Sequence, residues 1–366
     1  MSKRLEILYN KKPCYDIVIE NELTPLAKEM EELEVENKRL CIVTDSRVRQ
    51  LYGDSLIKLL TPLAKQVEIF VFSEGEASKT LDTVRQLYCF LIEKHFDRKD
   101  MLVALGGGVV GDLTGYAAAT YLRGIDFIQI PTSLLAQVDS SIGGKTGVDF
   151  DQYKNMVGAF KMPRLVYINL SALASLDSRQ FYNGFAEVMK YGLIKDAAFY
   201  EWMISKLYEI DERQQDILEE MIYRSCLIKK AVVEKDPTEQ GERALLNFGH
   251  TIGHAIEKEM NFSLLHGECV ALGSVAAAYI SWKKGYLSME EYYEIRDMFV
   301  PFHLPISIEN IEPEKILAHT KSDKKMEQGQ IKFILLKKIG KAFMDKTVTE
   351  EEIINGVEEI IYRDEN

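Results

Sequence analysis

Three histidines lie close together in the second half of the chain. His250 and His254 are four residues apart in NFGHTIGHAIE, and His266 follows in LHGE. A spacing of four places two side chains on one face of a helix. Imidazoles combined with a carboxylate and an open position form the ligand set of a catalytic zinc site. The HxxxH spacing alone also fits two core or surface histidines, so both interpretations stay open on this segment.

A carboxylate and an amine occur in the otherwise apolar segment NGFAEVMKYG. Glu187 and Lys190 are three residues apart and share one face of a predicted helix. A solvated ion pair is the simplest interpretation of such spacing. Because the surrounding residues are apolar, a buried carboxylate with a functional role is the alternative.

A glycine-rich turn follows an apolar run in the first half of the chain. Gly106, Gly107 and Gly108 separate residues 101–105 from a helical pattern at residues 113–121. Glycines allow the backbone to approach a pyrophosphate, and the amides at a helix N-terminus bind anions. The spacing differs from G-x-G-x-x-G, so a tight turn without a ligand is an equal alternative.

Other loops carry groups that suit a nucleotide or an anion. Asp45 follows one predicted strand, and SEGEASK at residues 73–79 follows the next. The segment SSIGGKTG resembles a P-loop, but Asp139 stands where that motif needs a glycine, so the segment is not a nucleotide-triphosphatase loop. A flexible glycine loop with a lysine remains suited to a phosphate or a carboxylate.

The elements that position these groups differ between the two halves. Apolar runs in the first half alternate with helical patterns, which predicts a parallel sheet covered on both faces. After about residue 175 helical patterns dominate, so we expect domains at 1–174 and 175–366. The predicted strands are residues 39–44, 67–72, 101–105, 126–130 and 164–168. The predicted helices are residues 46–60, 80–95, 178–191, 196–208, 215–234, 248–260, 267–284 and 289–299, with a short hairpin near 330–336.

The composition limits the class of protein. Of the 366 residues 46% are hydrophobic, which allows a large core, and the net charge of −12 argues against a general nucleic-acid binder. The N-terminus has no apolar signal region, and no run reaches the roughly 20 apolar residues of a spanning helix. The five cysteines are scattered without a CxxC pair, which is typical of reduced thiols. We expect a cytoplasmic enzyme without membrane or nucleic-acid partners.

Taken together, these segments resemble the 3-dehydroquinate synthase family, a group of sugar phosphate cyclases, over nearly the whole chain. The resemblance is carried by eight ordered blocks: SEGEASKT, LGGGVVGDLTGYAAATYLRG, IPTSLLAQVDSSIGGKTGVD, KNMVGAF, GFAEVMKYG, RALLNFGHTIGHAIE, LHGE and SDKK. It implies an N-terminal Rossmann-like, NAD-binding α/β domain, then an all-α metal- and substrate-binding domain, with the active site in the cleft between them.

The resemblance also implies a reaction. The substrate would be a small sugar phosphate, 3-deoxy-D-arabino-heptulosonate 7-phosphate, and the products 3-dehydroquinate and phosphate, a step of the shikimate pathway. NAD-dependent oxidation at C5 is transient: phosphate is eliminated, C5 is reduced again and an intramolecular aldol closes the ring. NAD+ and one divalent metal, Zn²⁺ or alternatively Co²⁺, are the expected cofactors, and a homodimer is the expected assembly.

The resemblance assigns residues to these roles. Glu187, His250 and His266 would be metal ligands, and His254 a catalytic residue beside them. The catalytic and substrate-binding residues would be Asp139, Lys145, Lys190, Lys229, Arg243 and Asn247. Phosphate would be bound by Asn155, by Lys324 or Lys325, and by Arg123 reaching into the neighbouring subunit. The nicotinamide-nucleotide contacts would be Asp45, Glu76, Lys79, Gly107, Gly108, Asp112, Thr132, Ser133, Lys145, Lys154 and Ser175.

The sequence departs from the family pattern at three places. Ser133 and Ser175 stand where the family often has threonine, and both keep a hydroxyl group. Pro237 replaces a common glutamate, which could reshape its loop. The rivals are another sugar phosphate cyclase, of the 2-deoxy-scyllo-inosose or valiolone type, a glycerol-dehydrogenase-like oxidoreductase, and a catalytically silent binding protein.

Overall fold

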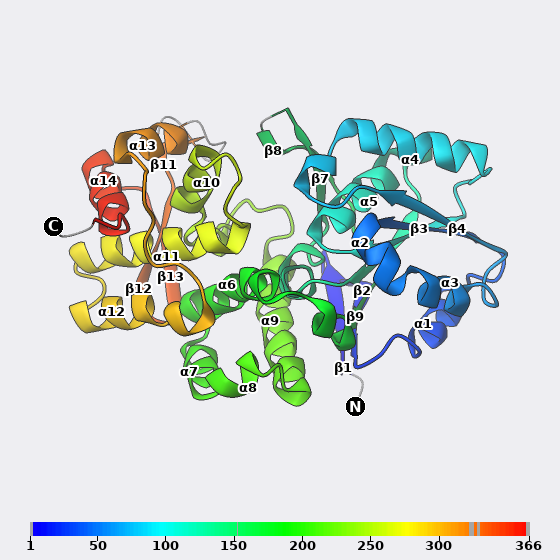
Figure 1. Cartoon of the computed structure of the whole chain (residues 1–366), viewed down its shortest axis with the longest axis horizontal. Coiled ribbons are helices and arrows are strands. Elements are labelled where there is room, and N and C mark those ends of the chain that lie inside the picture. Colours follow the sequence, from blue (N-terminus) through cyan, green and yellow to red (C-terminus); the bar gives the residue numbers. More distant parts are fainter. Residues whose placement is uncertain (1–2, 152, 322–325, 328–329, 364–366) are drawn as a thin grey trace. The chain divides into compact units, whose positions relative to one another are not determined.

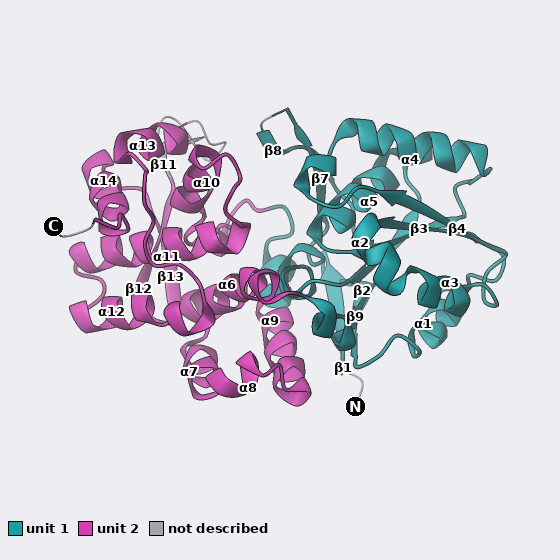
Figure 2. Ribbon diagram, in the orientation of Figure 1, with its two compact units in different colours: residues 1–176, 229–238 teal, residues 177–228, 239–366 magenta. Residues whose placement is uncertain are grey.

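The computed structural model describes residues 3–151, 153–321, 326–327 and 330–363 (Figure 1). The chain forms two compact units (Figure 2). Unit 1 is Met1–Leu176 with Lys229–Thr238, and unit 2 is Asp177–Ile228 with Glu239–Asn366. The chain therefore returns to unit 1 at residue 229 and enters unit 2 again at residue 239. The predicted division into residues 1–174 and 175–366 does not include this return.

Unit 1 is built on a seven-stranded sheet of order β1-β2-β9-β6-β5-β3-β4. Its neighbouring strands are parallel except that β1 is antiparallel to β2. The five predicted strands are confirmed as β3, β4, β5, β6 and β9. The bounds are β1 (Lys3–Tyr9), β2 (Lys12–Glu20), β3 (Arg39–Asp45), β4 (Gln66–Phe72), β5 (Met101–Gly106), β6 (Asp126–Pro131) and β9 (Leu165–Asn169).

Helices cover both faces of this sheet, as the continuous apolar strands predict. Successive side chains of a strand point to opposite faces. Thus Leu102 packs in one core cluster with α4 (Leu81–Glu93) and α5 (Gly108–Thr120), while Val103 packs in the other with α1 (Leu26–Glu32) and α3 (Asp54–Leu60). The short helix α2 (Ser46–Val48) follows β3.

Three features of unit 1 differ from the prediction. The edge strands β1 and β2 were not predicted. A hairpin, β7 (Lys145–Phe150) and β8 (Tyr153–Phe160), occupies the region expected to be a loop. Helix α5 begins at Gly108 rather than at residue 113, so Gly107 is its N-cap and the last of the three glycines is its first residue.

Unit 2 is mostly helical, as predicted, and its chain also forms antiparallel hairpins. A hairpin was expected near residues 330–336. The described residues there form the short hairpin β10–β11 and the longer hairpin β12–β13, in which Phe333 lies opposite Asp345. The helices are α6 (Ser178–Lys195), α7 (Ala197–Ser205), α8 (Leu207–Asp211), α10 (His250–Glu259), α11 (His266–Lys283), α12 (Met289–Asp297), α13 (Pro313–Lys321) and α14 (Glu350–Glu359). The strands are β10 (Met326–Glu327), β11 (Gln330–Ile331), β12 (Phe333–Lys338) and β13 (Lys341–Asp345), and α9 (Gln215–Lys235) begins in unit 2 and ends in unit 1.

Side-chain caps fix where several helices of unit 2 begin. Asp177 accepts a hydrogen bond from the amide of Gln180 at the start of α6. Thr349 does the same for the amide of Glu352 at the start of α14. Such caps satisfy amides that have no partner within the helix. No helix among the described residues is long and apolar enough to cross a membrane.

Candidate metal centre and nucleotide-binding residues

Three helices of unit 2 bring Glu187, His250 and His266 together. Glu187 lies on α6, His250 is the first residue of α10, and His266 is the first residue of α11. One ligand atom from each lies within 4.8 Å of the others. Nε2 of each histidine is 3.3 Å from Oε1 of Glu187. The residues predicted to bind a metal therefore converge on one point.

The convergence depends on a close contact between the backbones of α10 and α11. A Cβ atom on Gly273 would lie 2.0 Å from the carbonyl oxygen of Gly249, and one on Gly253 would lie 2.7 Å from that of Cys269. Only glycine fits at such distances. As a result the ring centroid of His250 lies 5.2 Å from that of His254 and 5.3 Å from that of His266.

Glu187 is fully buried and stays ionised because positive groups surround it. Its Oε2 forms an ion pair with Nζ of Lys190, which is buried as well. Burial alone would raise the pKa of Glu187, but the charge of Lys190 and the hydrogen bond with His266 reverse this and hold the pKa well below its usual range. The predicted i,i+3 pair is thus a buried pair and not a solvated one.

His250 presents a lone pair to the same point. Nδ1 of His250 lies 3.0 Å from the carbonyl oxygen of Phe248, which can only accept, so Nδ1 carries the hydrogen and Nε2 is unprotonated. Burial and the charge of Lys190 lower the pKa of His250 to about 4. Its Nε2 and the Glu187 carboxylate are therefore two acceptors that face each other, an arrangement that a cation between them would stabilise.

His266 differs from His250 in the direction of its pKa shift. Burial would lower the pKa of His266, but the hydrogen bond and charge of Glu187 outweigh it and raise the pKa. The set of two nitrogens and one oxygen fits Zn²⁺ and also other divalent transition metals. The donor chemistry thus agrees with a metal centre.

His254 belongs to a second possible ligand group with Glu257 and His266. This second group shares His266 with the group of Glu187, His250 and His266, so the two possible metal positions are neighbours. Its existence leaves the catalytic role of His254 as a prediction, since the geometry is compatible with either a ligand or a neighbouring proton-transfer group.

The predicted nucleotide contacts of unit 1 include a buried charged cluster. Nζ of Lys79 lies 2.6 Å from Oδ2 of Asp112 and 2.6 Å from Oδ1 of Asn155. Nζ of Lys154 is 3.8 Å from Oε1 of Glu76. Asn155, assigned by resemblance to the phosphate, thus lies beside two of the predicted cofactor contacts.

The remaining predicted nucleotide contacts lie mainly at strand ends of the same sheet. Asp45 ends β3 and caps α2 by accepting from the amides of Arg47 and Val48. Gly107 and Gly108 begin α5, directly after β5. Thr132 and Ser133 directly follow β6. Ligands in parallel α/β sheets bind at the carboxyl ends of the strands. Ser175 lies apart, after β9, with its Oγ 2.5 Å from the hydroxyl of Tyr52.

The predicted substrate residues are distributed over the two units. In unit 1, Nζ of Lys229 donates to Oδ1 of Asp139 at 2.6 Å, whereas Lys145 and Arg123 are exposed. In unit 2, Arg243 is fully buried, and Asn247 donates to Glu239 at 2.8 Å. Lys324 and Lys325 lie outside the described residues.

Comparisons with known proteins show the family to which the chain belongs. The family model "3-dehydroquinate synthase N-terminal" matches residues 69–183, and "3-dehydroquinate synthase C-terminal" matches residues 184–326. The chain belongs to the 3-dehydroquinate synthase family. A 3-dehydroquinate synthase of Acetivibrio thermocellus is 41% identical over 343 residues, covering 94% of this chain and 95% of that protein.

Solved structures of other sugar phosphate cyclases share the fold of this family member. A 2-epi-5-epi-valiolone synthase from Streptomyces hygroscopicus with NAD+ and Zn²⁺ bound has a TM-score of 0.89 at 28% identity, covering 97% of this chain and 99% of that one. A 2-deoxy-scyllo-inosose synthase in complex with carbaglucose-6-phosphate, NAD+ and Co²⁺ has a TM-score of 0.86 at 26% identity, with the same coverage.

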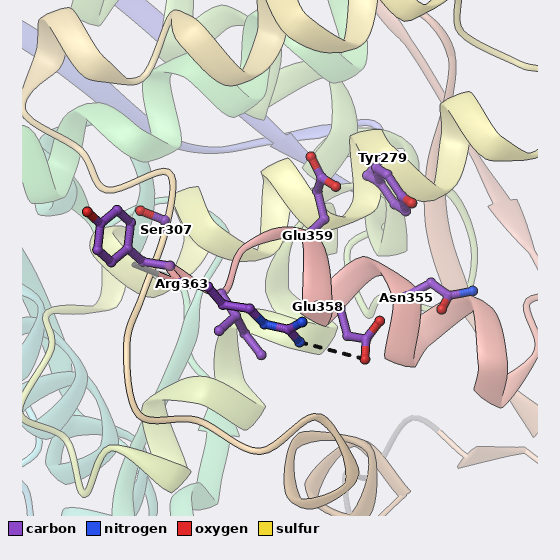
Figure 3. Close-up of a pocket in the computed structure, with 8 residues that line it drawn as sticks. Tyr279, Ser307, Asn355, Glu358, Glu359 and Arg363 are labelled. Carbon is purple, nitrogen blue, oxygen red and sulfur yellow. Dashed lines mark ion pairs between the residues drawn. The ribbon is translucent and has the colours of Figure 1, made fainter. Parts of the chain in front are cut away.

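A cavity of about 570 Å³ in unit 2 has no metal ligand in its lining (Figure 3). Glu358 and Arg363 face each other across it at 4.0 Å, and both are exposed. Oε1 of Glu359 already accepts a hydrogen bond from the hydroxyl of Tyr292. None of the predicted site residues that the structure describes lines this surface hollow.

Sequence patterns did not single out several residues that support the metal centre. Asn183 accepts a hydrogen bond from the amide of Gly267, 84 residues away. Glu257 is buried three residues after His254. An acidic residue one turn from HxxxH is a signal that could have pointed to Glu257. No spacing rule links Asn183 to Gly267, because their contact depends on how two distant helices cross.

Proposed function

We propose that this family member is a 3-dehydroquinate synthase, which converts 3-deoxy-D-arabino-heptulosonate 7-phosphate to 3-dehydroquinate and phosphate. The observation that carries the proposal is the convergence of Glu187, His250 and His266 beside the buried Lys190. The 41% identity to a curated 3-dehydroquinate synthase over 94% of the chain supports this choice among the sugar phosphate cyclases.

The proposed cofactors are NAD+ and a divalent metal, which supply a reversible hydride acceptor and a Lewis acid. Glu187, His250 and His266 would hold the metal. The first turn of α5 would bind the pyrophosphate of NAD+, because it begins at Gly108 directly after a strand and its amides lack partners within the helix. The cluster of Lys79 and Asp112 would orient the rest of the dinucleotide.

The side chains of the chain itself would bind and orient the substrate. Arg243 and Lys190 are buried cations, and buried cations attract carboxylate and hydroxyl oxygens strongly because water does not screen them. Lys229 would be held in place by Asp139 and point its remaining donors to the substrate. His254 would move a proton between substrate and solvent, since its ring lies next to both histidine ligands.

Further parts of the proposal concern the phosphate, the assembly and the compartment. Arg123, Asn155 and one lysine of the pair Lys324 and Lys325 would bind phosphate. Arg123 would do so in the neighbouring subunit of a homodimer, and its exposed side chain is compatible with that. A cytoplasmic location is proposed because all five cysteines are free thiols.

The test is phosphate release by the purified protein. With the heptulosonate phosphate, a catalytic amount of NAD+ and Zn²⁺, we expect phosphate and 3-dehydroquinate in equal amounts and no accumulation of NADH. A chelator should stop the reaction, and added metal should restore it. Steady accumulation of NADH would instead indicate a dehydrogenase, and no turnover with both cofactors bound would indicate a silent binding protein.

Another sugar phosphate cyclase activity is the second candidate, favoured by the likeness to the 2-deoxy-scyllo-inosose synthase structure. A substrate without a carboxylate distinguishes the two. If glucose 6-phosphate releases phosphate faster than the heptulosonate phosphate does, the proposed assignment is wrong. The buried Arg243 and Lys190 favour a carboxylate substrate.

A further inference from the structure

Asn183 links two of the helices that carry the metal ligands. It lies on α6, four residues before Glu187, and its side chain is 7% exposed. Its Oδ1 accepts a hydrogen bond of 2.5 Å from the backbone amide of Gly267, the residue that directly follows His266. One side chain thus connects the helix of one metal ligand to the backbone beside another.

Helix α11 needs this bond because its own N-cap residue cannot supply it. The first amides of a helix have no acceptor within the helix and are usually satisfied by a polar N-cap side chain. The N-cap of α11 is Leu265, which has no side-chain acceptor. The amide of Gly267 is buried and is instead satisfied by Asn183 from a helix far away in the sequence.

The contact between the two helices leaves little freedom. A Cβ atom on Gly267 would lie 2.0 Å from the carbonyl oxygen of Asn183, so the two backbones touch at this point. A second link lies one turn away on α6, where Arg179 pairs with Glu268 at 2.6 and 2.8 Å. That pair is half-exposed and contributes little by itself. The buried bond and the backbone contact therefore both hold the first turn of α11 against α6.

We propose that Asn183 is a positioning residue of the metal centre: it holds the first turn of α11 so that His266 meets the metal at a fixed distance from Glu187. The inference rests on the proposed metal role of these residues. Removing groups that orient a metal ligand typically weakens metal binding by about 10- to 100-fold. Asn183 does not itself touch the metal or the substrate.

The test compares metal binding by the full-length protein and by Asn183→Ala, using Zn²⁺ in competition with a chelator and the absorption spectrum of bound Co²⁺. We expect the dissociation constant for Zn²⁺ to rise about 10- to 100-fold and the Co²⁺ spectrum to change. Asn183→Asp keeps an oxygen that accepts from Gly267, so it should recover most of the affinity.

Thr349→Ala is the matched control, since it removes the side-chain cap of α14 in the same unit but none of the contacts of α6 with α11. It should lower stability without changing the metal affinity or the Co²⁺ spectrum. If Asn183→Ala binds Zn²⁺ as tightly as the natural protein, the positioning role is wrong. If the natural protein itself binds no metal, the proposed metal centre fails instead.

A measurement on the natural protein keeps the proposal testable even if Asn183→Ala does not fold. An amide at the second position of a helix normally exchanges quickly with water, because it has no partner in the helix. With glycines labelled by ¹⁵N, the Gly267 amide should exchange slowly in the metal-free protein. Exchange as fast as that of an open helix end would overturn the inference.

Discussion

At the scale of single residues, the metal centre combines three different protonation behaviours. Glu187 remains ionised because of its buried partner Lys190. His250 remains neutral because burial and the charge of Lys190 lower its pKa to about 4, and the carbonyl of Phe248 fixes its tautomer. His266 is the group that takes up a proton, since the carboxylate of Glu187 raises its pKa. Metal ligands must be deprotonated, so His266 is the residue at which protons compete with the metal.

Metal binding should therefore weaken as the pH falls, beginning above the usual pKa of histidine. In the metal-free protein the pKa of His266 is raised above 6.5, whereas that of His250 is lowered to about 4. Above the pKa of His266 the affinity should be independent of pH, and below it the affinity should fall by up to about tenfold per pH unit. Chelator competition between pH 6 and 8 measures this. An affinity that stays constant down to pH 6 would contradict the assignment.

The buried cation Lys79 should contribute to the stability of the folded chain. Burial would lower the pKa of Lys79, but Asp112 and Glu76 outweigh it and raise the pKa, so the ammonium stays charged. Lys79→Met leaves Asp112 without its partner, and we expect the free energy of unfolding to fall by about 3–5 kcal/mol in urea titrations.

Two controls make the Lys79 result specific. Arg49→Met removes a pair in which Asp54 is exposed, so it should cost no more than about 1 kcal/mol. Lys79→Met combined with Asp112→Asn removes both charges and should recover part of the loss. If the double substitution is as unstable as Lys79→Met, unpaired charge is not the cause.

At the scale of elements, the contact of α10 with α11 determines whether the histidines converge. Gly273→Ala would place a Cβ atom 2.0 Å from the carbonyl oxygen of Gly249. Because backbone is involved on both sides, the helices must separate, and we expect a loss of at least about 1–3 kcal/mol of stability together with loss of metal binding. Thermal unfolding and metal analysis measure the two effects.

Gly356→Ala is the matched control for this substitution. Its new Cβ would meet the end of the Ile280 side chain of the same helix α11 at 2.9 Å, and that side chain can move aside. The natural metal content should persist. An equal loss of metal from Gly273→Ala and Gly356→Ala would show that the separation of α10 and α11 does not cause the loss of metal.

The elements also show what the sequence could predict. Strands β3 and β5 were predicted within one residue, because buried parallel strands have continuous apolar runs. The hairpin β7–β8 was missed because Gly147 and Gly158 face each other there and much of β8 is exposed, so no apolar pattern marks it. The metal ligands were predicted through the family resemblance, and their convergence agrees with that prediction. Asn183 and Gly267 meet only through the crossing of α6 and α11.

At the scale of the whole molecule, each unit contains a buried cysteine whose reaction with a thiol reagent can follow the unfolding of that unit. Cys41 lies in β3 of unit 1, while Cys269 lies in α11 of unit 2, three residues after His266, and both are buried. Burial and the nearby Glu68 raise the pKa of the Cys41 thiol, so it is unreactive in the folded state. Cys89 is exposed and should react with a thiol reagent at once.

Labelling of these thiols should show which unit a ligand stabilises. A ligand that binds only the folded form stabilises it by RT ln(1 + [L]/Kd), about 2.7 kcal/mol at a hundredfold excess over Kd. In mild denaturant Zn²⁺ should therefore slow the labelling of Cys269 about 100-fold and leave Cys41 much less affected, whereas NAD+ should do the reverse. Mass spectrometry of peptides from each unit measures both rates. Equal protection of the two cysteines by Zn²⁺ would contradict this prediction. It would mean that the two units unfold in one step, so that a ligand of one unit stabilises the whole chain.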